Sequence, residues 1–248
     1  MAEYMRSHMI ADAQSGYCPG CLHELATRLV SDVIEELGQA DNSLNVISVG
    51  CSALNILYWN GDFLSVAHGR APAAATGVKR TNPERLVFAY QGDGDLAAIG
   101  LAEIMSAANR GENFTVIFAN NQTYGMTGGQ MAPTTLLGQK TTTTVYGRDA
   151  ETTGYPMKMC ELISTLEAPV FVARYALNSP KGIRDARAGI KKAFEYQLAG
   201  KGFTFVELLT NCPTNWKLSP LQTLEYMNTN TIPYFKPGVY KDKEAENV

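Results

Sequence analysis

The chain has 248 residues, of which 45% are hydrophobic and 18% charged, a balance typical of an ordered globular protein. Its formal net charge of −3 argues against a nucleic-acid-binding surface, and no apolar run reaches the roughly 18 residues that a membrane helix needs. Residues 1–8 contain no apolar segment of the kind found in a secretory signal. We therefore expect a cytoplasmic protein whose five cysteines serve metal ligation or burial rather than disulfides.

Helical patterns alternate with short apolar runs along the chain. In chain order, we predict a helix over 22–37, a strand over 45–49, a helix over 70–78, a strand over 85–90, a helix over 96–110, a strand over 114–119, a Gly/Thr-rich stretch over 123–148, a strand over 169–174, a helix over 182–198 and a strand over 203–209. No repeat or linker interrupts them, so residues 1–248 are expected to form one domain. Residues 214–248 are expected to form a C-terminal extension on the domain surface or on a partner.

The order of these elements indicates an α/β fold, a doubly wound parallel sheet with helices on both faces. In such sheets, ligands bind beyond the carboxyl ends of the strands. The glycine- and amide-rich segments that follow predicted strands are Gly50-Cys51-Ser52, Gly92-Asp93-Gly94-Asp95, residues 120–129 and Asn211-Cys212-Pro213. We therefore expect the binding site at this edge of the sheet.

The segment around Asp93 closes a predicted strand and opens a predicted helix. Glycines let the backbone approach a phosphate, and a helix N-terminus offers free N–H groups. An acidic side chain beside a phosphate needs a cation between them, so Asp93 indicates Mg²⁺. Asn121 follows the next strand, 28 residues later, and can give its side-chain oxygen to the same ion, with a backbone carbonyl from Thr123. This pattern resembles the thiamine-diphosphate signature, and a helix cap with a turn residue is the structural alternative.

Four cysteines fall at the same predicted edge. Cys18 and Cys21 form a C-x-x-C at the start of a helix, a spacing that lets two thiolates converge on one metal centre. Cys51 and Cys212 each follow a predicted strand. Four converging thiolates suit a 4Fe-4S cluster, with structural zinc as the alternative. Cys160 lies in a helical pattern, where we expect it to be a buried, small apolar side chain.

Taken together, these motifs make residues 15–213 resemble the β subunit of 2-oxoacid:ferredoxin oxidoreductases. The resemblance rests on Tyr17-Cys18-Pro19-Gly20-Cys21, Gly50-Cys51-Ser52, His68-Gly69-Arg70, Gly92-Asp93-Gly94-Asp95-Leu96, Asn120-Asn121, Tyr124-Gly125-Met126-Thr127-Gly128-Gly129-Gln130 and Asn211-Cys212-Pro213. Many relatives carry Gly-His after the second cysteine, where this chain has Leu22-His23. The resemblance implies a thiamine-diphosphate-binding fold in which the four cysteines hold a 4Fe-4S cluster and Asp93, Asn121 and Thr123 bind Mg²⁺.

The matched motifs also indicate which residues contact the organic cofactor and the substrate. The expected cofactor-binding residues are Cys51, Ser52, Gly92, Gly94, Asp95, Asn121, Gly125, Met126 and Thr127. His68 and Arg70 are the candidate catalytic residues, directing a hydrogen bond or a charge toward the substrate or the diphosphate. For His68, a structural role with satisfied hydrogen bonds is the alternative.

The implied activity is oxidative decarboxylation of a 2-oxo acid to an acyl-CoA and CO₂, with electrons passed through the cluster to ferredoxin. Residues 52–55 and Met126 are apolar or neutral, whereas a dicarboxylate would want a basic partner. We therefore expect a branched-chain 2-oxo acid, with 2-oxoglutarate or pyruvate as the alternatives. The expected partners are an α subunit, which would supply a glutamate to the cofactor, and a ferredoxin or ferredoxin-like subunit. The chain alone is expected to be inactive.

Two other classes of protein stay open at this point. A non-redox thiamine-dependent decarboxylase or synthase subunit would have no need of the four cysteines. A zinc-stabilised binding subunit would have no need of the diphosphate signature.

Overall fold

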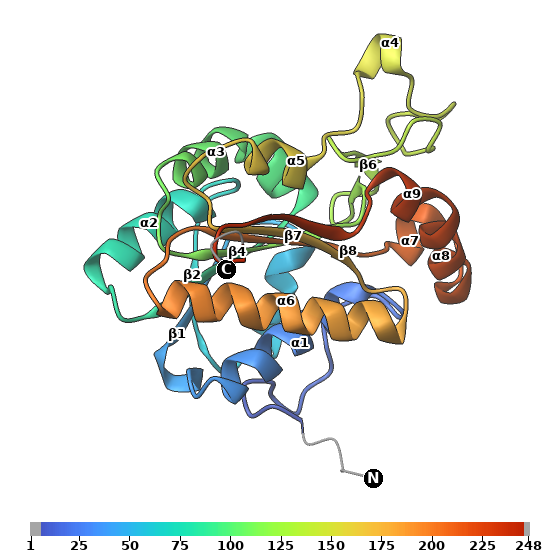
Figure 1. Ribbon diagram of the computed structural model, residues 1–248. Helices are drawn as coiled ribbons and strands as arrows, with labels where there is room; N and C mark the ends of the chain where they lie inside the picture. The colour runs from blue at the N-terminus through green and yellow to red at the C-terminus, as the bar shows by residue number, and fades with distance from the viewer. Residues whose placement is uncertain (1–5, 246–248) are drawn as a thin grey trace.

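The computed structural model describes residues 6–245, so residues 1–5 of the segment considered for a secretory signal lie outside the described part. A seven-stranded sheet crosses the centre of the molecule, and helices cover both of its faces (Figure 1). The strand order is β2-β1-β3-β4-β8-β7-β9, and a separate two-stranded sheet joins β5 and β6. All neighbours in the large sheet are parallel except β7 and β9.

The bounds of the elements are as follows. The strands are β1 (Ser43–Ile47), β2 (Asp62–Ser65), β3 (Leu86–Gly92), β4 (Thr115–Asn120), β5 (Thr123–Tyr124), β6 (Gln130–Met131), β7 (Phe171–Ala176), β8 (Thr204–Leu209) and β9 (Gly238–Asp242). The α-helices are α1 (Leu22–Glu36), α2 (Ala71–Thr81), α3 (Leu101–Asn109), α4 (Ala150–Thr153), α5 (Met159–Ser164), α6 (Pro180–Leu198), α7 (Pro213–Trp216), α8 (Pro220–Tyr226) and α9 (Ile232–Tyr234). The 3-10 helices are η1 (Ala40–Asn42) and η2 (Cys51–Leu57), and the π-helices are η3 (Gly94–Ile99) and η4 (Met227–Thr231).

The predicted α/β architecture is confirmed, with corrections at its edges. The five predicted strands form as β1, β3, β4, β7 and β8, and the four predicted helices form as α1, α2, α3 and α6. The predicted strand over 45–49 starts and ends two residues earlier, and the predicted helix over 96–110 begins as the π-helix η3. The edge strands β2 and β9 were not predicted, and β9 runs antiparallel, so the sheet is not parallel throughout.

The two faces of the sheet carry separate apolar cores. On one face, α1 and α6 pack against strand residues that include Phe88 and Tyr90. On the other face, α2, α3 and α5 pack against strand residues that include Val87 and Ala89. Successive residues of β3 therefore point to opposite faces and are buried on both, which explains why its sequence is a continuous apolar run.

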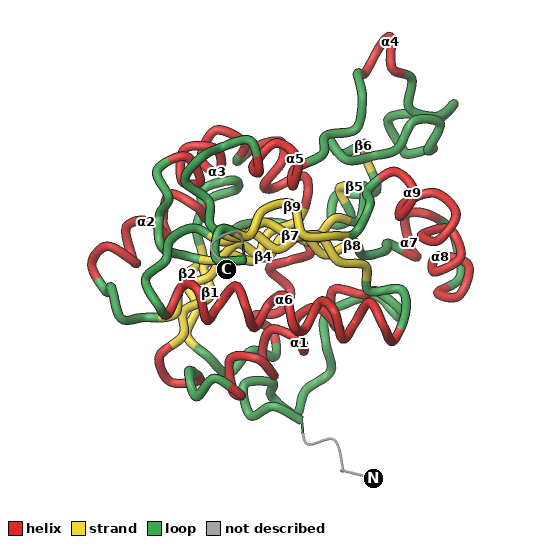
Figure 2. The backbone as a smooth tube through the Cα atoms, in the orientation of Figure 1, coloured by secondary structure: helices red, strands yellow, loops and turns green. Residues whose placement is uncertain are grey.

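Residues 132–157 form an arm that projects from the body of the molecule and carries α4 (Figure 1). Apart from α4, the arm is built of loops and turns (Figure 2). At its base, Arg148 is buried and donates hydrogen bonds to the backbone carbonyls of Pro133, Thr135 and Tyr155. The Pro133 carbonyl also accepts a hydrogen bond from the backbone N–H of Met157, so the guanidinium and this bond fix the base of the arm without regular secondary structure.

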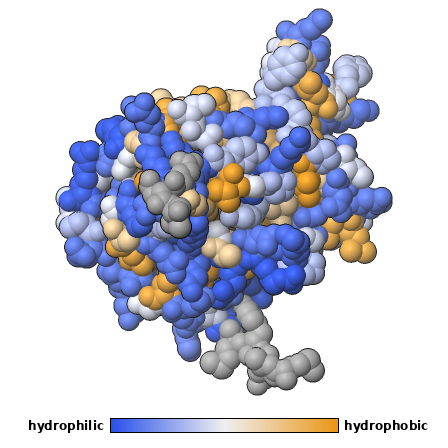
Figure 3. All heavy atoms as spheres, in the orientation of Figure 1, coloured by the Kyte–Doolittle hydropathy of each residue, from blue (hydrophilic) through white to orange (hydrophobic). Residues whose placement is uncertain are grey.

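The described residues after β8 pack on the domain itself. Met227 and Phe235 form a small apolar cluster with Leu209 and Leu136, and β9 then returns to the sheet beside β7. The face of the molecule drawn in Figure 3 is mostly hydrophilic, with scattered apolar residues. Within residues 6–245, no helix combines the length and the apolar character needed to cross a membrane.

Candidate functional site

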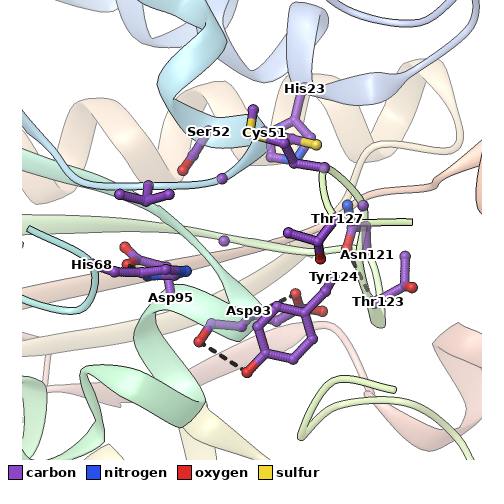
Figure 4. A pocket seen from close by; sticks show the side chains of 16 residues that line it. His23, Cys51, Ser52, His68, Asp93, Asp95, Asn121, Thr123, Tyr124 and Thr127 are labelled. Atoms are coloured by element: carbon purple, nitrogen blue, oxygen red, sulfur yellow. Dashed lines mark hydrogen bonds and ion pairs between the residues drawn. The ribbon is translucent and has the colours of Figure 1, made fainter. Parts of the chain in front are cut away.

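A pocket lies beyond the carboxyl ends of β1, β3 and β4, at the edge of the sheet that the sequence predicts (Figure 4). It is lined by His23, Val49, Gly50, Cys51, Ser52, His68, Gly92, Asp93, Gly94, Asp95, Asn121, Thr123, Tyr124, Gly125, Met126 and Thr127. All nine predicted cofactor-binding residues and the three predicted Mg²⁺ ligands are in this set. The fold therefore brings together segments that are far apart in the sequence.

Asp93 follows β3 directly, and only 2% of its surface is exposed. Its Oδ1 accepts a hydrogen bond from the backbone N–H of Gly94 at 2.8 Å, and its Oδ2 accepts one from the hydroxyl of Thr134 at 2.7 Å. Burial raises the pKa of Asp93 to about 6, against the lowering effect of these hydrogen bonds. A cation beside this carboxylate would favour its charged form, which suits a Mg²⁺ ligand.

The turn after β4 presents Asn121 and Thr123 to the same pocket. Gln122, between them, has a φ of +61°, in the left-handed region that residues other than glycine rarely adopt. Its side chain donates a hydrogen bond to Thr231 at 2.9 Å, and its carbonyl accepts one from Thr135 at 2.6 Å. These two contacts hold the turn, so the unusual backbone at Gln122 sets how its two neighbours face the pocket.

The lining of the pocket contains a tightly packed glycine and a buried hydroxyl that has no protein partner. A Cβ at Gly94 would lie 2.1 Å from the ring of Tyr124, so only glycine fits under that ring. The hydroxyl of Ser52 is buried and has no hydrogen-bond partner within the described chain, and in Figure 4 it points into the pocket. A buried polar atom without a partner costs free energy, so Ser52 is suited to a polar ligand.

The two candidate catalytic residues differ in their placement. His68 lines the pocket, and its Nδ1 is hydrogen-bonded to the carboxylate of Asp95. Arg70 does not line the pocket, and it forms an ion pair with Glu103 of α3 instead. To reach a substrate, the Arg70 guanidinium would have to leave this ion pair.

A second cavity brings the four predicted cluster cysteines together. It is lined by Tyr17, Cys18, Cys21, His23, Cys51, Leu54, Asn121, Gly125, Cys212, Pro213, Thr214 and Asn215. Within residues 6–245, no three His, Cys, Asp or Glu side chains lie close enough to hold a single metal ion, and the four thiols instead surround this shared cavity. The fifth cysteine, Cys160, is fully buried in the core formed with α2, α3 and α5.

Three of the four thiols of this cavity are in surroundings that disfavour their charged forms. Burial raises the pKa of Cys21 to about 12 and that of Cys51 to about 12. Burial also raises the pKa of Cys212, and the hydrogen bond that the amide of Asn215 donates to its Sγ at 3.2 Å acts in the opposite direction. Thiolates are the metal-binding form of cysteine, so a metal centre here would displace protons as it binds.

The pocket and the cysteine cavity share a wall. His23, Cys51, Asn121 and Gly125 line both of them. A Cβ at Gly125 would lie 3.0 Å from the Sγ of Cys51, so glycine lets this wall be thin. His23 is 1% exposed, burial lowers its pKa to about 4, and its Nδ1 is hydrogen-bonded to the hydroxyl of Tyr90 at 2.7 Å. A neutral histidine therefore stands between the two cavities.

The sequence alone does not predict the roles of several residues that shape the site. Thr134 contacts Asp93 from 41 positions away, on a loop without periodicity. Asn211 lies in a quoted motif, but no role was predicted for its side chain, which donates hydrogen bonds to the carbonyl of Gly20 at 3.1 Å and to Thr223 at 2.6 Å. The only signal for Asn211 was its place directly before Cys212.

The chain resembles known proteins over nearly its whole length. Residues 48–208 match the family described as thiamine pyrophosphate enzyme, C-terminal TPP binding domain. The chain is 45% identical over 236 residues to the ketoisovalerate oxidoreductase subunit VorA of Methanothermobacter thermautotrophicus, covering 95% of this chain and 50% of the relative. It is 35% identical over 237 residues to the 2-oxoglutarate synthase subunit KorB of Methanocaldococcus jannaschii, covering 93% of this chain and 82% of the relative.

A solved structure agrees with these relatives. The 2-oxoglutarate:ferredoxin oxidoreductase from Magnetococcus marinus, with 2-oxoglutarate, coenzyme A and succinyl-CoA bound, matches with a TM-score of 0.81 and 26% identity. The match covers 98% of this chain and 86% of that one. The chain spans about half the length of the ketoisovalerate relative. By its TPP-binding domain, its relatives and its fold, the chain belongs to the 2-oxoacid:ferredoxin oxidoreductase family, as a subunit of the β type.

Proposed function

We propose that this chain is the thiamine-diphosphate-binding subunit of an oxidoreductase that converts a 2-oxo acid and coenzyme A to an acyl-CoA and CO₂ and passes the electrons to ferredoxin through a 4Fe-4S cluster. The observation that carries this proposal is the wall shared by the pocket and the cysteine cavity. A non-redox decarboxylase has no use for four thiols beside its cofactor. A zinc-stabilised binding subunit has no use for the pocket.

The pocket residues suit a diphosphate and its metal ion. Asp93 and Asn121, with the backbone carbonyl of Thr123, are the proposed Mg²⁺ ligands, and the ion would lie between these oxygens and the diphosphate. The proposed cofactor contacts are Cys51, Ser52, Gly92, Gly94, Asp95, Asn121, Gly125, Met126 and Thr127. When bound, thiamine diphosphate supplies a carbanion that attacks the keto carbon of the substrate, while the chain supplies position and electrostatics.

The four thiols suit an iron–sulfur cluster. Cys18, Cys21, Cys51 and Cys212 come from three separate segments and line one cavity. Cys51 is common to the cavity and the pocket, so a cluster held there would lie next to the cofactor that generates the electrons. This adjacency favours an electron acceptor over structural zinc.

The pocket lining favours an apolar substrate. It contains no Lys or Arg side chain among the described residues, although a distal carboxylate such as that of 2-oxoglutarate would want one. The 45% identity to a ketoisovalerate oxidoreductase subunit points the same way. We therefore propose a branched-chain 2-oxo acid, with 2-oxoglutarate and pyruvate as the alternatives. A partner subunit could supply a missing charge and would change this preference.

The remaining parts of the enzyme are proposed to come from other chains. The relatives named above are subunits, which supports a hetero-oligomer with an α subunit and a ferredoxin or ferredoxin-like subunit. The α subunit would complete the substrate site and contribute a glutamate to the cofactor. The cytoplasm is the proposed location of the assembly.

The test is to coexpress the chain with its partner subunits, purify the assembly without oxygen, and measure iron, sulfide, zinc and thiamine diphosphate. CoA-dependent dye reduction is then assayed with 2-oxoisovalerate, 2-oxoglutarate and pyruvate. We expect at least one 4Fe-4S cluster for each copy of this chain and the highest kcat/KM for 2-oxoisovalerate. Zinc in place of iron, or decarboxylation without electron transfer, would refute the redox function, and a much higher kcat/KM for 2-oxoglutarate would refute only the substrate.

A further inference from the structure

Asp95 lines the pocket, but its carboxylate oxygens already accept hydrogen bonds from other groups of the protein. The side chain is only 2% exposed. Its Oδ1 is bonded to the backbone N–H of Gly69 at 2.6 Å and to His68 Nδ1, and its Oδ2 is bonded to Gln91 Nε2 at 2.6 Å and to the hydroxyl of Ser48. An ionised carboxylate accepts about four hydrogen bonds, so Asp95 is well supplied without any ligand. Two of these four hydrogen bonds come from the loop that carries His68, and the other two come from Gln91 and Ser48.

The backbone on both sides holds this contact in place. Asp95 lies in the π-helix η3, whose wide turn is closed by a hydrogen bond from the N–H of Gly100 to the carbonyl of Asp95 at 2.8 Å. Gly69 has a φ of +80°, and a Cβ there would lie 2.7 Å from the nitrogen of Gly100. The two glycines therefore pack backbone against backbone. Single π-turns inside helices occur often at functional sites, and here the turn brings the Asp95 carboxylate to the His68 loop.

The hydrogen-bond roles follow from the partners. The backbone N–H of Gly69 and the amide nitrogen of Gln91 can only donate, so the carboxylate is the acceptor in this network. His68 Nδ1 then carries the hydrogen. In a neutral imidazole, this leaves Nε2 as the acceptor, and Nε2 has no hydrogen-bond partner among the described residues. The His68 side chain is 30% exposed, in contrast to the buried His23 of the same pocket.

We propose that Asp95 is a positioning residue that fixes the ring and tautomer of His68, so that Nε2 exchanges a proton with the oxo oxygen of the bound 2-oxo acid. The inference rests on the proposed function. When the keto carbon is attacked, its oxygen gains negative charge, and protonated His68 gives the Nε2 proton to that oxygen and becomes neutral. The reverse transfer restores the imidazolium when the oxygen releases its proton. Throughout, the Nδ1 hydrogen stays on His68 and is donated to Asp95, whose negative charge stabilises the imidazolium.

The test uses D95N and H68N in the assembled holoenzyme. In D95N, the amide oxygen can still accept from Gly69 and His68. Its new N–H groups can meet the Gln91 Oε1, which is buried without a partner, after a flip of that amide. D95N should therefore fold and keep its iron and thiamine diphosphate. Its kcat should fall at least about 10-fold while KM for the 2-oxo acid stays within about twofold, because the lost charge serves the proton transfer and not binding.

The double variant separates a positioning role from a merely structural one. If Asp95 acts through His68, then D95N/H68N loses no more than about twofold beyond H68N, because the two residues act as a unit. Another His–carboxylate pair provides the matched control: His8 Nδ1 lies 2.6 Å from Glu35 Oε1 on the surface, away from the pocket. H8N and E35Q should keep wild-type kcat.

Each result decides the matter. Losses that multiply in the double variant, or a D95N enzyme with wild-type kcat, would overturn the positioning role. If D95N does not accumulate, H68N alone tests the proposal. A wild-type kcat in H68N would mean that His68 has no part in the reaction, and Asp95 could then not act through it. A wild-type assembly without iron or without oxoacid-dependent electron transfer would instead refute the proposed function, so the two failures are distinguishable.

Discussion

The side-chain oxygen of Asn211 accepts a hydrogen bond from the backbone N–H of Leu22 at 2.9 Å, joining the end of β8 to the first residue of α1. The amide group of Asn211 also binds the carbonyl of Gly20. One side chain therefore fastens the loop that carries Cys18 and Cys21 to the segment that carries Cys212. This link holds together the two segments that line the cysteine cavity.

Asn211→Ala should destabilise the protein by about 1–3 kcal/mol, because it removes a fully buried side chain that bonds the buried hydroxyl of Thr223 and the part-buried N–H of Leu22. The iron content should fall as well, since the two halves of the cysteine set are no longer tied. Denaturant unfolding and iron analysis measure the two effects. Asn42→Ala, at an exposed turn, is the control. Unchanged iron and stability in Asn211→Ala would contradict the link.

Single replacements of Cys18, Cys21, Cys51 and Cys212 by Ser should each remove or damage the cluster, because each thiol lines the cavity. Cys160→Ala should keep full iron, since Cys160 belongs to α5 and its thiol is buried in the core on the opposite face of the sheet from α1. Iron and sulfide analysis of the five anaerobically purified variants makes the comparison. Full iron in the Cys212 variant, or loss in the Cys160 variant, would mean that the ligand set is different.

Asp93→Ala should abolish binding of thiamine diphosphate, because the diphosphate loses its Mg²⁺ ligand. Bound cofactor is measured after purification and by titration with Mg²⁺ present. Asp185→Ala, in an exposed ion pair with Lys181, should bind normally. Stoichiometric cofactor in the purified Asp93 variant would contradict the assignment of the metal site.

Thr134→Val keeps the shape of the side chain and removes the hydroxyl that donates to Asp93 Oδ2. Residues that orient metal ligands typically contribute 10–100-fold to affinity, so we expect Mg²⁺-dependent cofactor binding to weaken by at least about 10-fold. Isothermal titration at fixed thiamine diphosphate gives the Mg²⁺ affinity. Thr76→Val, which loses only a helix-backbone contact, is the matched control. Equal affinity in the two variants would mean that Asp93 needs no such support.

His23 should make stability depend on pH between about 6.5 and 4. Burial lowers its pKa from an ordinary value of 6.5 to about 4, so the unfolded chain takes up a proton in this range while the folded chain does not. The buried His23 therefore lowers the free energy of unfolding as pH falls below 6.5, and the loss is about 2 kcal/mol at pH 5. Below pH 4 this contribution does not change further. Denaturant unfolding of wild type and His23→Gln at pH 7 and pH 5 measures it. The variant should lose less stability than wild type, and identical losses would contradict the buried neutral state.

The sequence predicted the interior of the fold better than its edges. The five predicted strands are the buried ones, because burial on both faces demands continuous apolar residues. All four residues of β2 are exposed, and β9 includes a lysine and an aspartate, so neither carries a periodic apolar signal. Edge strands of this kind are defined by the backbone of their neighbour and not by their own side chains.

For the site, motif spacing predicted the residues that gather at the strand ends, and it missed those that hold them. Asp93 and Asn121 follow strands directly, so their meeting follows from the topology. The π-turn at Asp95 and the partner of Arg70, Glu103, depend on how α3 packs against the loop before α2. Such contacts leave no spacing rule in the sequence, which explains why Arg70 was expected at the pocket and is found in an ion pair beside it.

The left-handed backbone of Gln122 has a consequence for binding. Such a conformation costs a residue with a side chain about 1–3 kcal/mol, and here Thr135 and Thr231 impose it as the chain folds. The distortion is therefore part of the free energy of folding, and a ligand that meets Asn121 and Thr123 finds both already oriented. A substitution that relaxed this turn would raise the free energy of unfolding and weaken ligand binding. Stability and affinity therefore oppose each other at this one residue.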